Sequence, residues 1–423
     1  MVETAGTPAE LDVMVEAARQ RYIDARPLSA QAHEEARVHL PGGNTRSVLH
    51  FDPFPYRVAT ADGAVQTDLD GHTYVDFCGN YTAGLFGHSN EVIRDAIVAT
   101  LDDGWAIGGV RAQEATLAKL LCERFPSLDQ VRFTNSGTEA NLMAIGTALH
   151  HADGDGVMVF DRGYHGGVLS FRDPDAPPSP LNAPYDFTVC DFNDTDGAVA
   201  QIETGRFGCV VVEPVQGSAG CRVGDLSFLR GLRDACDRTG TLLIFDEVMT
   251  SRLSASGAQG RFGVTPDLTT LGKYFGGGMS FGAFGGRADV MAHFDADQGG
   301  VLTQAGTFNN NAASINAAVA VLTEVLTPPR LDDVNARGDE LRGSLNEVLQ
   351  HHDRSLEVIG LGSMLCVHAT DPRELELLFL HLLDHGLFIA PRGFIALSMA
   401  ITDDHTAQLV AAVEDWAEGS ASR

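Results

Sequence analysis

The spacing of apolar residues predicts that strands and helices alternate from about residue 85 to residue 315. Segments with apolar residues at helical spacing, such as Glu139–His150 and Leu226–Arg238, separate short apolar runs that read as strands. This alternation is typical of an α/β fold with a mostly parallel sheet and helices on both faces. The seven strand candidates are Gln130–Thr134, Gly156–Phe160, Phe187–Cys190, Cys209–Glu213, Thr241–Asp246, Leu268–Gly272 and Gly282–Gly286.

The two ends of the chain predict a second, smaller α+β unit. Residues 8–38 read as helical, and β-like runs follow at 56–59 and 73–77. Pro328-Pro329 is expected to end a long helix and marks a candidate boundary. We therefore expect an N-terminal segment 1–70 belonging to a small domain, a large domain 71–318, and the rest of the small domain in 319–423. The last part should contain a helix (331–351), strands (356–369), a helix (373–386), a strand pair (387–400) and a terminal helix (404–417).

Charge and cysteine content exclude several classes of partner. Basic residues number 29 against 57 acidic ones, a formal net charge of −28, so we expect neither a nucleic-acid nor a membrane partner. The seven cysteines contain no Cys-x-x-Cys pair, which predicts no disulfide framework and no metal site. The N-terminus resembles no signal peptide, and no apolar run approaches the ~20 residues of a membrane span. A cytoplasmic location is therefore expected.

Lysine is almost absent from the chain, which has 27 arginines and only Lys119 and Lys273. Lys119 lies on the polar face of a predicted amphipathic helix over 112–125 and is interpreted as an ordinary surface residue. Lys273 directly follows a predicted strand and precedes a glycine-rich stretch. Its amine can lose a proton, which arginine cannot do, and a deprotonated amine can form a Schiff base with an aldehyde.

A possible phosphate site lies at the start of the predicted helix that follows the strand Gln130–Thr134. Ser136-x-x-Glu139 matches a capping box, which alone explains the sequence. The free N–H groups of a helix start and the hydroxyls of Ser136 and Thr138 would equally favour an anion. These residues by themselves leave both interpretations open.

Asp246 ends the apolar strand Thr241–Asp246, at the edge of the sheet where ligands bind in α/β proteins. An aspartate there could hold a proton on a pyridinium nitrogen, or it could simply cap the next turn. Asp246 and Lys273 are 27 residues apart (273 − 246), enough for one helix and one strand. We therefore expect both side chains to face one crevice from neighbouring strands.

Three further positions complete an ordered set whose members are individually weak signals. Glu213 ends another buried strand, Tyr164 offers an aromatic face that could stack on a cofactor ring, and Thr307 offers a hydroxyl before a helix. The order along the chain is phosphate turn, Tyr-His, Glu-Pro, Asp, Lys and Thr.

This ordered set resembles the class III aminotransferases, which are pyridoxal-phosphate (PLP) enzymes of fold type I. The resemblance covers nearly the whole chain and rests on five motifs: Ser-Gly-Thr-Glu-Ala (136–140), Tyr-His-Gly (164–166), Glu-Pro-Val (213–215), Asp-Glu-Val (246–248) and Gly-Lys (272–273). Glutamate-1-semialdehyde aminomutases share Pro-Gly-Gly at 41–43, but their usual Gly-Asn-Met-Gly is Gly-Ser-Ala-Gly here, at 217–220. Aminotransferases that act on β-phenylalanine are more similar, notably over 44–49, 81–84 and 391–394.

The resemblance implies a large domain with a mostly parallel seven-stranded sheet, a smaller α+β domain, and a homodimer with shared active sites. It implies that Lys273 binds the cofactor covalently and moves the proton, and that Asp246 pairs with the pyridine nitrogen. The other implied cofactor residues are Ser136, Gly137 and Thr138 at the phosphate, Tyr164 on the ring, Glu213 in the site, and Thr307 from the partner subunit.

For the substrate, the resemblance implies that Arg46 binds a carboxylate. Arg392 is a candidate second carboxylate site, and Tyr81 is a candidate pocket wall. The expected activity moves the amino group of an aromatic or aliphatic β-amino acid to a 2-oxo acid such as 2-oxoglutarate or pyruvate. The alternative is a glutamate-1-semialdehyde-type 2,1-aminomutase, which keeps the amine within one substrate.

Overall fold

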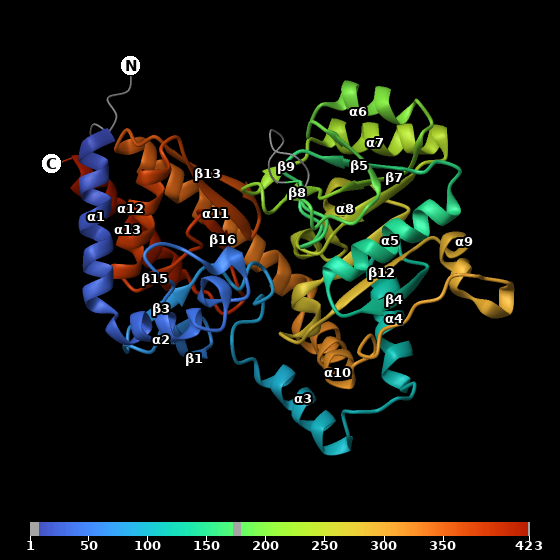
Figure 1. Cartoon of the computed structure of the whole chain (residues 1–423), viewed down its shortest axis with the longest axis horizontal. Coiled ribbons are helices and arrows are strands. Elements are labelled where there is room, and N and C mark those ends of the chain that lie inside the picture. Colours follow the sequence, from blue (N-terminus) through green and yellow to red (C-terminus); the bar gives the residue numbers. More distant parts are fainter. Residues whose placement is uncertain (1–7, 172–178, 422–423) are drawn as a thin grey trace. The chain divides into compact units, whose positions relative to one another are not determined.

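The computed structural model describes residues 8–171 and 179–421, and the chain divides into two compact units (Figure 1). The central unit comprises residues 91–335, and the terminal unit combines 1–90 with 336–423. The expected boundaries were 70/71 and 318/319. The first division falls later because strand β3 (Thr73–Asp76) pairs with β15 (Leu387–Phe388) of the terminal unit. The second falls later because residues up to Val325 pack on helix α3 (Glu91–Asp103) of the central unit.

The central unit contains a seven-stranded sheet in the order β4-β12-β11-β10-β7-β5-β6. β12 runs antiparallel to both neighbours and the other pairings are parallel, so the prediction of a mostly parallel sheet is confirmed. Each predicted strand is present with ends within two residues of the expectation. The strands are β4 (Gln130–Thr134), β5 (Gly156–Phe160), β6 (Asp186–Cys190), β7 (Phe207–Val212), β10 (Leu242–Asp246), β11 (Leu268–Gly272) and β12 (Gly282–Gly286).

Helices cover both faces of this sheet, as predicted. Successive strand residues point to opposite faces, so Val157 and Val159 pack with α5 (Gly137–His151) while Met158 and Phe160 pack with α6 (Thr195–Ile202) and α7 (Leu226–Thr239). Figure 1 shows α6 and α7 on one side of β5 and β7, with α5 on the other. The remaining helices are α3, α4 (Ala112–Arg124), α8 (Gly257–Phe262), α9 (Ala288–Met291) and α10 (Ala312–Ala320), and a short hairpin pairs β8 (Val215–Gln216) with β9 (Arg222–Val223).

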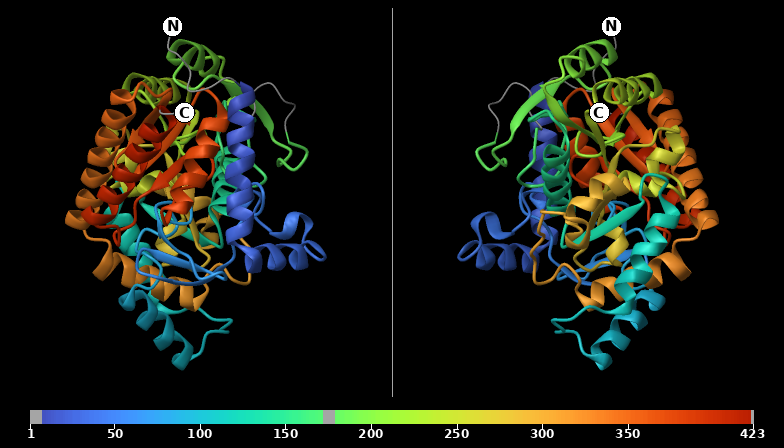
Figure 2. Two further views of the ribbon diagram at one scale, coloured as in Figure 1. Left: turned by 90° about the vertical axis from the view of Figure 1, so that its left-hand side faces the viewer. Right: turned by 90° about the vertical axis from the view of Figure 1, so that its right-hand side faces the viewer.

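The terminal unit contains two small sheets and five helices among its described residues. One sheet has the order β1-β2-β3-β15 and the other β13-β14-β16. Helix α1, near the N-terminus, packs along α12, near the C-terminus. In Figure 2, α1 is blue and lies beside orange-red helices. The elements not yet bounded are α1 (Pro8–Ala25), α2 (Pro27–Arg37), β1 (Val58–Asp62), β2 (Val65–Asp68), α11 (Pro328–His351), β13 (Leu356–Leu361), β14 (Met364–Ala369), α12 (Pro372–Asp384), β16 (Phe394–Ala396) and α13 (Asp403–Ala421); α11 begins in the central unit.

The helical prediction for 8–38 is confirmed, as two helices that meet at Pro27, which cannot continue α1 and instead occupies the first turn of α2. Two other sequence expectations for this part were wrong. Pro328 begins α11 rather than ending a helix, since proline is favoured in a first turn. The expected strand pair within 387–400 does not pair with itself: β15 joins β3, and β16 joins β14.

Within 8–171 and 179–421, no helix is both long and apolar enough to cross a membrane.

Candidate active site

Asp246 and Lys273 come from the carboxyl ends of adjacent parallel strands. Asp246 is the last residue of β10 and lies opposite Thr270 of β11, and Lys273 directly follows β11. The strands are therefore neighbours, as their spacing predicted. This edge of an α/β sheet is where ligands bind, because helix starts and strand ends converge there.

The backbone at Lys273 is strained. Its φ is +54°, in the left-handed region that costs a non-glycine residue free energy, and Gly272 before it is extended. Such strain persists where the surrounding structure imposes it, often at functional sites. Lys119, by contrast, lies on the surface of α4 with its side chain 74% exposed and its amine 3.6 Å from Glu123, as predicted.

The Asp246 carboxylate is buried and receives three hydrogen bonds. Its Oδ2 accepts from Asn141 Nδ2 at 2.9 Å and from His165 Nδ1 at 2.8 Å, and its Oδ1 accepts from the N–H of Val248 at 3.0 Å. A carboxylate has about four acceptor positions, so one position on Oδ1 remains for a further donor. A protonated ring nitrogen is a donor of the required kind.

Asn141 links Asp246 to the neighbouring strand. The Thr270 hydroxyl donates to Asn141 Oδ1 at 2.7 Å, which fixes the amide so that its nitrogen points to Asp246 and to the carbonyl of His165. Asn141 and Thr270 are both fully buried. No role was predicted from the sequence for Asn141 or Thr270, and His165 was considered only together with its neighbour Tyr164. The sequence did contain one signal: Asn141 is a polar residue among the alanines of the buried α5 face, and a buried polar group needs a hydrogen-bond partner.

Burial and neighbouring charges both change the pKa values of His165 and Glu213. Burial opposes protonation of His165, but its hydrogen bond to Asp246 and the Asp246 charge together raise the pKa of His165 above its usual value. Burial raises the pKa of Glu213 to about 7, and the charge of Asp246 acts in the same direction against the opposing effect of His165. Glu213 also accepts from the N–H groups of Tyr164 (2.9 Å) and Gly217 (3.2 Å), so it fixes the backbone that carries Tyr164.

The phosphate-turn candidates lie at the start of α5, a helix of 15 residues. Ser136 Oγ accepts from the N–H of Glu139 at 3.2 Å, and Glu139 Oε2 accepts from the N–H of Asn135 at 2.9 Å. Ser136 therefore caps α5, as the first of the two interpretations expected. The N–H groups of Gly137 and Thr138, in the first turn, have no acceptor within the helix and are oriented for an anion.

The space around this turn requires glycine at two positions. A Cβ at Gly137 would lie 2.7 Å from Val248 Cγ2, and a Cβ at Gly166 would overlap the Thr138 side chain. Gly166 also has φ +132°, which other residues rarely adopt. The close packing of Val248 and Gly166 holds the turn rigid, and it fits a phosphate group.

Thr307 is exposed on the surface of the chain, in the turn before α10. Asn309 of the same turn accepts a hydrogen bond from Asn135 at 3.0 Å, and Asn310 donates to Glu114 Oε1 at 2.9 Å. The neighbouring Phe308 is 65% exposed. These contacts hold the turn in place while leaving Thr307 accessible.

The predicted substrate residues lie in the terminal unit, where Arg46 and Tyr81 come together. Arg46 Nη1 donates to Asn80 Oδ1 at 2.7 Å, and its guanidinium carbon is 5.9 Å from the Tyr81 ring centroid. The Tyr81 hydroxyl donates to the carbonyl of Val48 at 2.9 Å, and its ring stacks on Phe394 with centroids 5.6 Å apart. Arg392 lies two residues before Phe394, and its carbonyl accepts from Cys366 Sγ at 3.4 Å.

The turn that carries Asn80 and Tyr81 is strained. Asn80, Tyr81 and Thr82 have φ values of 48°, 53° and 76°, so three successive non-glycine residues are left-handed. Each costs about 1–2 kcal/mol relative to a right-handed conformation. The arrangement places the Asn80 amide against Arg46 and the Tyr81 ring against Phe394.

The family model described as "Aminotransferase class-III" matches residues 49–172 and 181–416. The chain belongs to this family. It is 45% identical to β-phenylalanine transaminase of Variovorax paradoxus over 98% of both chains, and the solved structure of that protein has a TM-score of 0.95 over 97% of this chain and 98% of that one. An ω-transaminase structure from Sphaerobacter thermophilus is 34% identical, with a TM-score of 0.86 over 93% and 98%. Glutamate-1-semialdehyde 2,1-aminomutase 2 of Lachnoclostridium phytofermentans is 34% identical over 90% and 96%.

These similarities confirm the predicted family, the fold type I architecture and the enzyme class. Class III aminotransferases use PLP, so PLP is the cofactor of this enzyme. The central unit fits it: the α5 start suits the phosphate, Asp246 has a free acceptor position for the ring nitrogen, and Lys273 is an amine at the adjacent strand end.

Proposed function

We propose that this aminotransferase moves the amino group of a β-amino acid to a 2-oxo acid such as 2-oxoglutarate or pyruvate. The observation that carries the proposal is the Arg46 guanidinium beside the Tyr81 ring, which is itself stacked on Phe394. A cation beside one ring of a stacked aromatic pair suits a substrate with a carboxylate and an apolar side chain. The 45% identity to an enzyme named for β-phenylalanine supports the same class of donor.

The roles of the central-unit residues follow from their chemistry. Bound PLP supplies an aldehyde for covalent attachment and a protonated ring that withdraws electrons. We propose that Lys273 holds the cofactor in the resting enzyme and then moves the proton at the carbon that carries the amine. Asp246 keeps the ring nitrogen protonated, and Asn141 and His165 hold Asp246 in position. Ser136, Gly137 and Thr138 bind the phosphate, Tyr164 stacks on the ring, and Glu213 positions Tyr164.

Arg46 would define the substrate class. A β-amino acid has its carboxylate one carbon farther from the amine than an α-amino acid has. Arg46 would take that carboxylate with two charge-assisted hydrogen bonds, exchanging its present contact with Asn80. Tyr81 would form a wall of the side-chain pocket, and Arg392 would bind the second carboxylate of a dicarboxylic acceptor.

We propose that the enzyme is a homodimer. Five large apolar side chains between residues 98 and 110 are at least 45% exposed, including Trp105 (56%) and Val110 (88%). The turn of Thr307 and Phe308 adjoins this segment through Asn310, which donates to the carbonyl of Gly109 at 3.3 Å. An exposed apolar patch of this kind marks an interface. A second copy would bury it and would bring its own Thr307 to the phosphate of the first.

We further propose a reducing, cytoplasmic location, since none of the seven cysteines, all of which lie in the described residues, forms a disulfide. Small-molecule amino donor and acceptor would be the partners, with no nucleic acid, as the net charge of −28 favours.

The test is a panel of β-amino acids with 2-oxoglutarate and pyruvate. We expect turnover that requires an oxo acid, with β-amino acids preferred over α-amino acids and simple amines. Turnover of glutamate-1-semialdehyde without any oxo acid would instead support the aminomutase alternative, which the 34% identity to such enzymes keeps in view.

A further inference from the structure

A cluster of two histidines and an aspartate lies on the α12–α13 pair of the terminal unit, apart from every residue assigned above. It comprises His381, His385 and Asp415. We propose that this cluster binds one divalent transition-metal ion of the kind that imidazole and carboxylate ligands prefer, such as Ni²⁺ or Zn²⁺. No metal site was predicted from the sequence, because the cysteines contain no ligand pair and the spacing of the histidines carries no signal until α12 and α13 meet.

The spacing of the ligand atoms is that of a metal site. His381 and His385 lie four residues apart, on one face of the α12 helix and its C-terminal turn, with ring centroids 4.1 Å apart. Asp415 Oδ2 is 3.5 Å from His381 Nε2 and 3.7 Å from His385 Nε2. Ligands bound at about 2.1 Å to a tetrahedral ion lie about 3.4 Å from one another. The two distances to Asp415 are thus close to this value, and the ligand atoms of all three residues lie within 4.8 Å of one another. Water would complete the coordination of the ion.

The tautomer of His385 is set for coordination. His385 Nδ1 lies 2.9 Å from the carbonyl of His381, which can only accept, so Nδ1 carries the proton. Its Nε2 therefore presents a lone pair on the side of Asp415. A metal-bound histidine is commonly held in this way, with its other ring nitrogen donating to a backbone carbonyl.

His381 would exchange a hydrogen bond for the ion. Its Nε2 lies 3.0 Å from the carbonyl of Ala412, so metal binding requires that nitrogen to lose its proton. Asp384 and Asp415 add negative charge near His381, which favours a cation.

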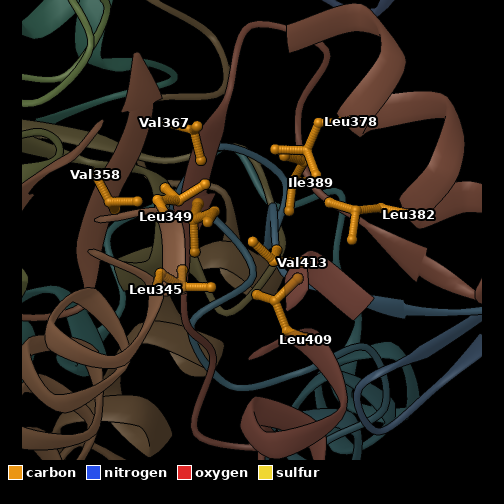
Figure 3. A pocket seen from close by; sticks show the side chains of 10 residues that line it. Leu345, Leu349, Val358, Val367, Leu378, Leu382, Ile389, Leu409 and Val413 are labelled. Carbon is orange, nitrogen blue, oxygen red and sulfur yellow. The ribbon is translucent and has the colours of Figure 1, made fainter. Parts of the chain in front are cut away.

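Apolar packing fixes the two helices that carry the ligands. Leu378 and Leu382 of α12 and Leu409 and Val413 of α13 surround one apolar cavity (Figure 3). The cavity volume is about 10 Å³, no more than one water molecule needs, so the helices are closely packed. His381 lies between Leu378 and Leu382 in sequence, and Asp415 lies two residues after Val413. The ligands are thus held on a rigid support.

A second cluster on the same unit provides a matched control. His352, Glu414 and Glu418 also lie within ligand distance of one another, but they offer one imidazole and two carboxylates. Transition metals favour the site with more imidazole ligands. His352→Gln should therefore leave the high-affinity site intact, whereas His385→Gln and Asp415→Asn each remove one ligand from it.

The experiment is calorimetric titration of Ni²⁺ into the untagged, full-length, PLP-saturated enzyme. We expect one high-affinity Ni²⁺ per wild-type chain, an affinity at least about tenfold lower in His385→Gln and in Asp415→Asn, and no change in His352→Gln. His385 and Asp415 are exposed, so both variants should fold and transaminate normally. Ni²⁺ should raise the Tm of wild type and of His352→Gln, but not that of His385→Gln.

Three results would overturn the proposal. Wild type could take up no Ni²⁺, the His385→Gln and Asp415→Asn variants could bind it as wild type does, or His352→Gln could remove the binding. The second result would place the ion elsewhere, for example at a cysteine.

Discussion

The region around Asp246 and the region around Arg46 are built in opposite ways. Asp246 is 4% exposed, lies at the end of a central strand and receives three hydrogen bonds from buried groups. Arg46 is exposed, lies in an irregular segment, and donates a hydrogen bond to Asn80, which lies on a turn with three left-handed positions. The proposed cofactor chemistry thus rests on a rigid sheet edge. The proposed choice of substrate rests on a strained surface turn that substitutions can change without disturbing the sheet.

The largest effect is expected at Lys273. Replacing Lys273 with alanine should reduce transamination by several orders of magnitude, because we propose that its amine both attaches the cofactor and moves the proton. Steady-state rates and the absorbance of bound cofactor measure the two roles. Lys119→Arg is the control and should match wild type, since Lys119 is exposed on α4. Normal turnover in Lys273→Ala would refute the assignment.

Asp246→Asn should have the next largest effect. The variant is nearly isosteric but cannot hold a charge, so we expect a loss of about 10²–10³-fold in kcat with the fold retained. Circular dichroism and cofactor absorbance should show a folded, loaded enzyme. A normal kcat in a PLP-saturated Asp246→Asn protein would show that Asp246 only caps the following turn.

A smaller effect is expected at Thr270, which acts through Asn141. Thr270→Val keeps the shape of the side chain but removes the hydroxyl that orients the Asn141 amide. The loss should be about 1–3 kcal/mol of stability from one unpaired buried acceptor, together with a modest fall in kcat at unchanged KM. Denaturation and kinetics measure both. Thr241→Val is the control, because the Thr241 hydroxyl donates to the carbonyl of Phe207 and accepts from Thr239, at the opposite end of β10 from Asp246. An equal fall in kcat in Thr241→Val would argue against a specific link between Thr270 and Asp246.

The pH dependence of stability should reveal the Glu213–His165 pair. Burial raises the pKa of Glu213 to about 7 from an ordinary 4.5, so the folded apoenzyme binds this proton more readily than the unfolded chain. The resulting stabilisation is complete below about pH 4.5 and is lost as the pH rises through 7. The raised pKa of His165 acts in the same direction above its ordinary value of 6.5. The free energy of urea unfolding of the apoenzyme should therefore lose this contribution as the pH rises through 7, and the loss should be smaller in Glu213→Gln. Identical pH profiles for wild type and Glu213→Gln would contradict the pairing.

Much of the central unit could be predicted from the sequence, for a physical reason. A strand buried on both faces reads as an apolar run, as in β5, which was predicted to the residue. β4, β11 and β12 were also predicted to the residue, although polar residues or glycines interrupt their apolar positions. The scarcity of lysine singled out Lys273, and its separation from Asp246 predicted adjacent strands.

The rest depended on contacts that local patterns do not contain. Asn141 and Asp246 are 105 residues apart, and only the folded sheet brings them together. Proline fits a helix start and also follows a helix end, so Pro328 could not be placed without its surroundings. The metal-site candidate likewise needs α13 to bring Asp415 to two histidines of another segment.

The most direct test of the account is one ratio, measured in wild type and in Arg46→Ala. It is kcat/KM for a β-amino acid divided by kcat/KM for an amine without a carboxylate. A bidentate guanidinium–carboxylate pair contributes about 1.5–3 kcal/mol, so the ratio should fall by at least about tenfold in the variant, through a higher KM for the β-amino acid and for the oxo acid. Turnover of the simple amine should change little. An unchanged ratio, or a wild type that prefers the amine, would contradict Arg46 as the substrate-selecting residue while leaving the PLP chemistry of the central unit intact.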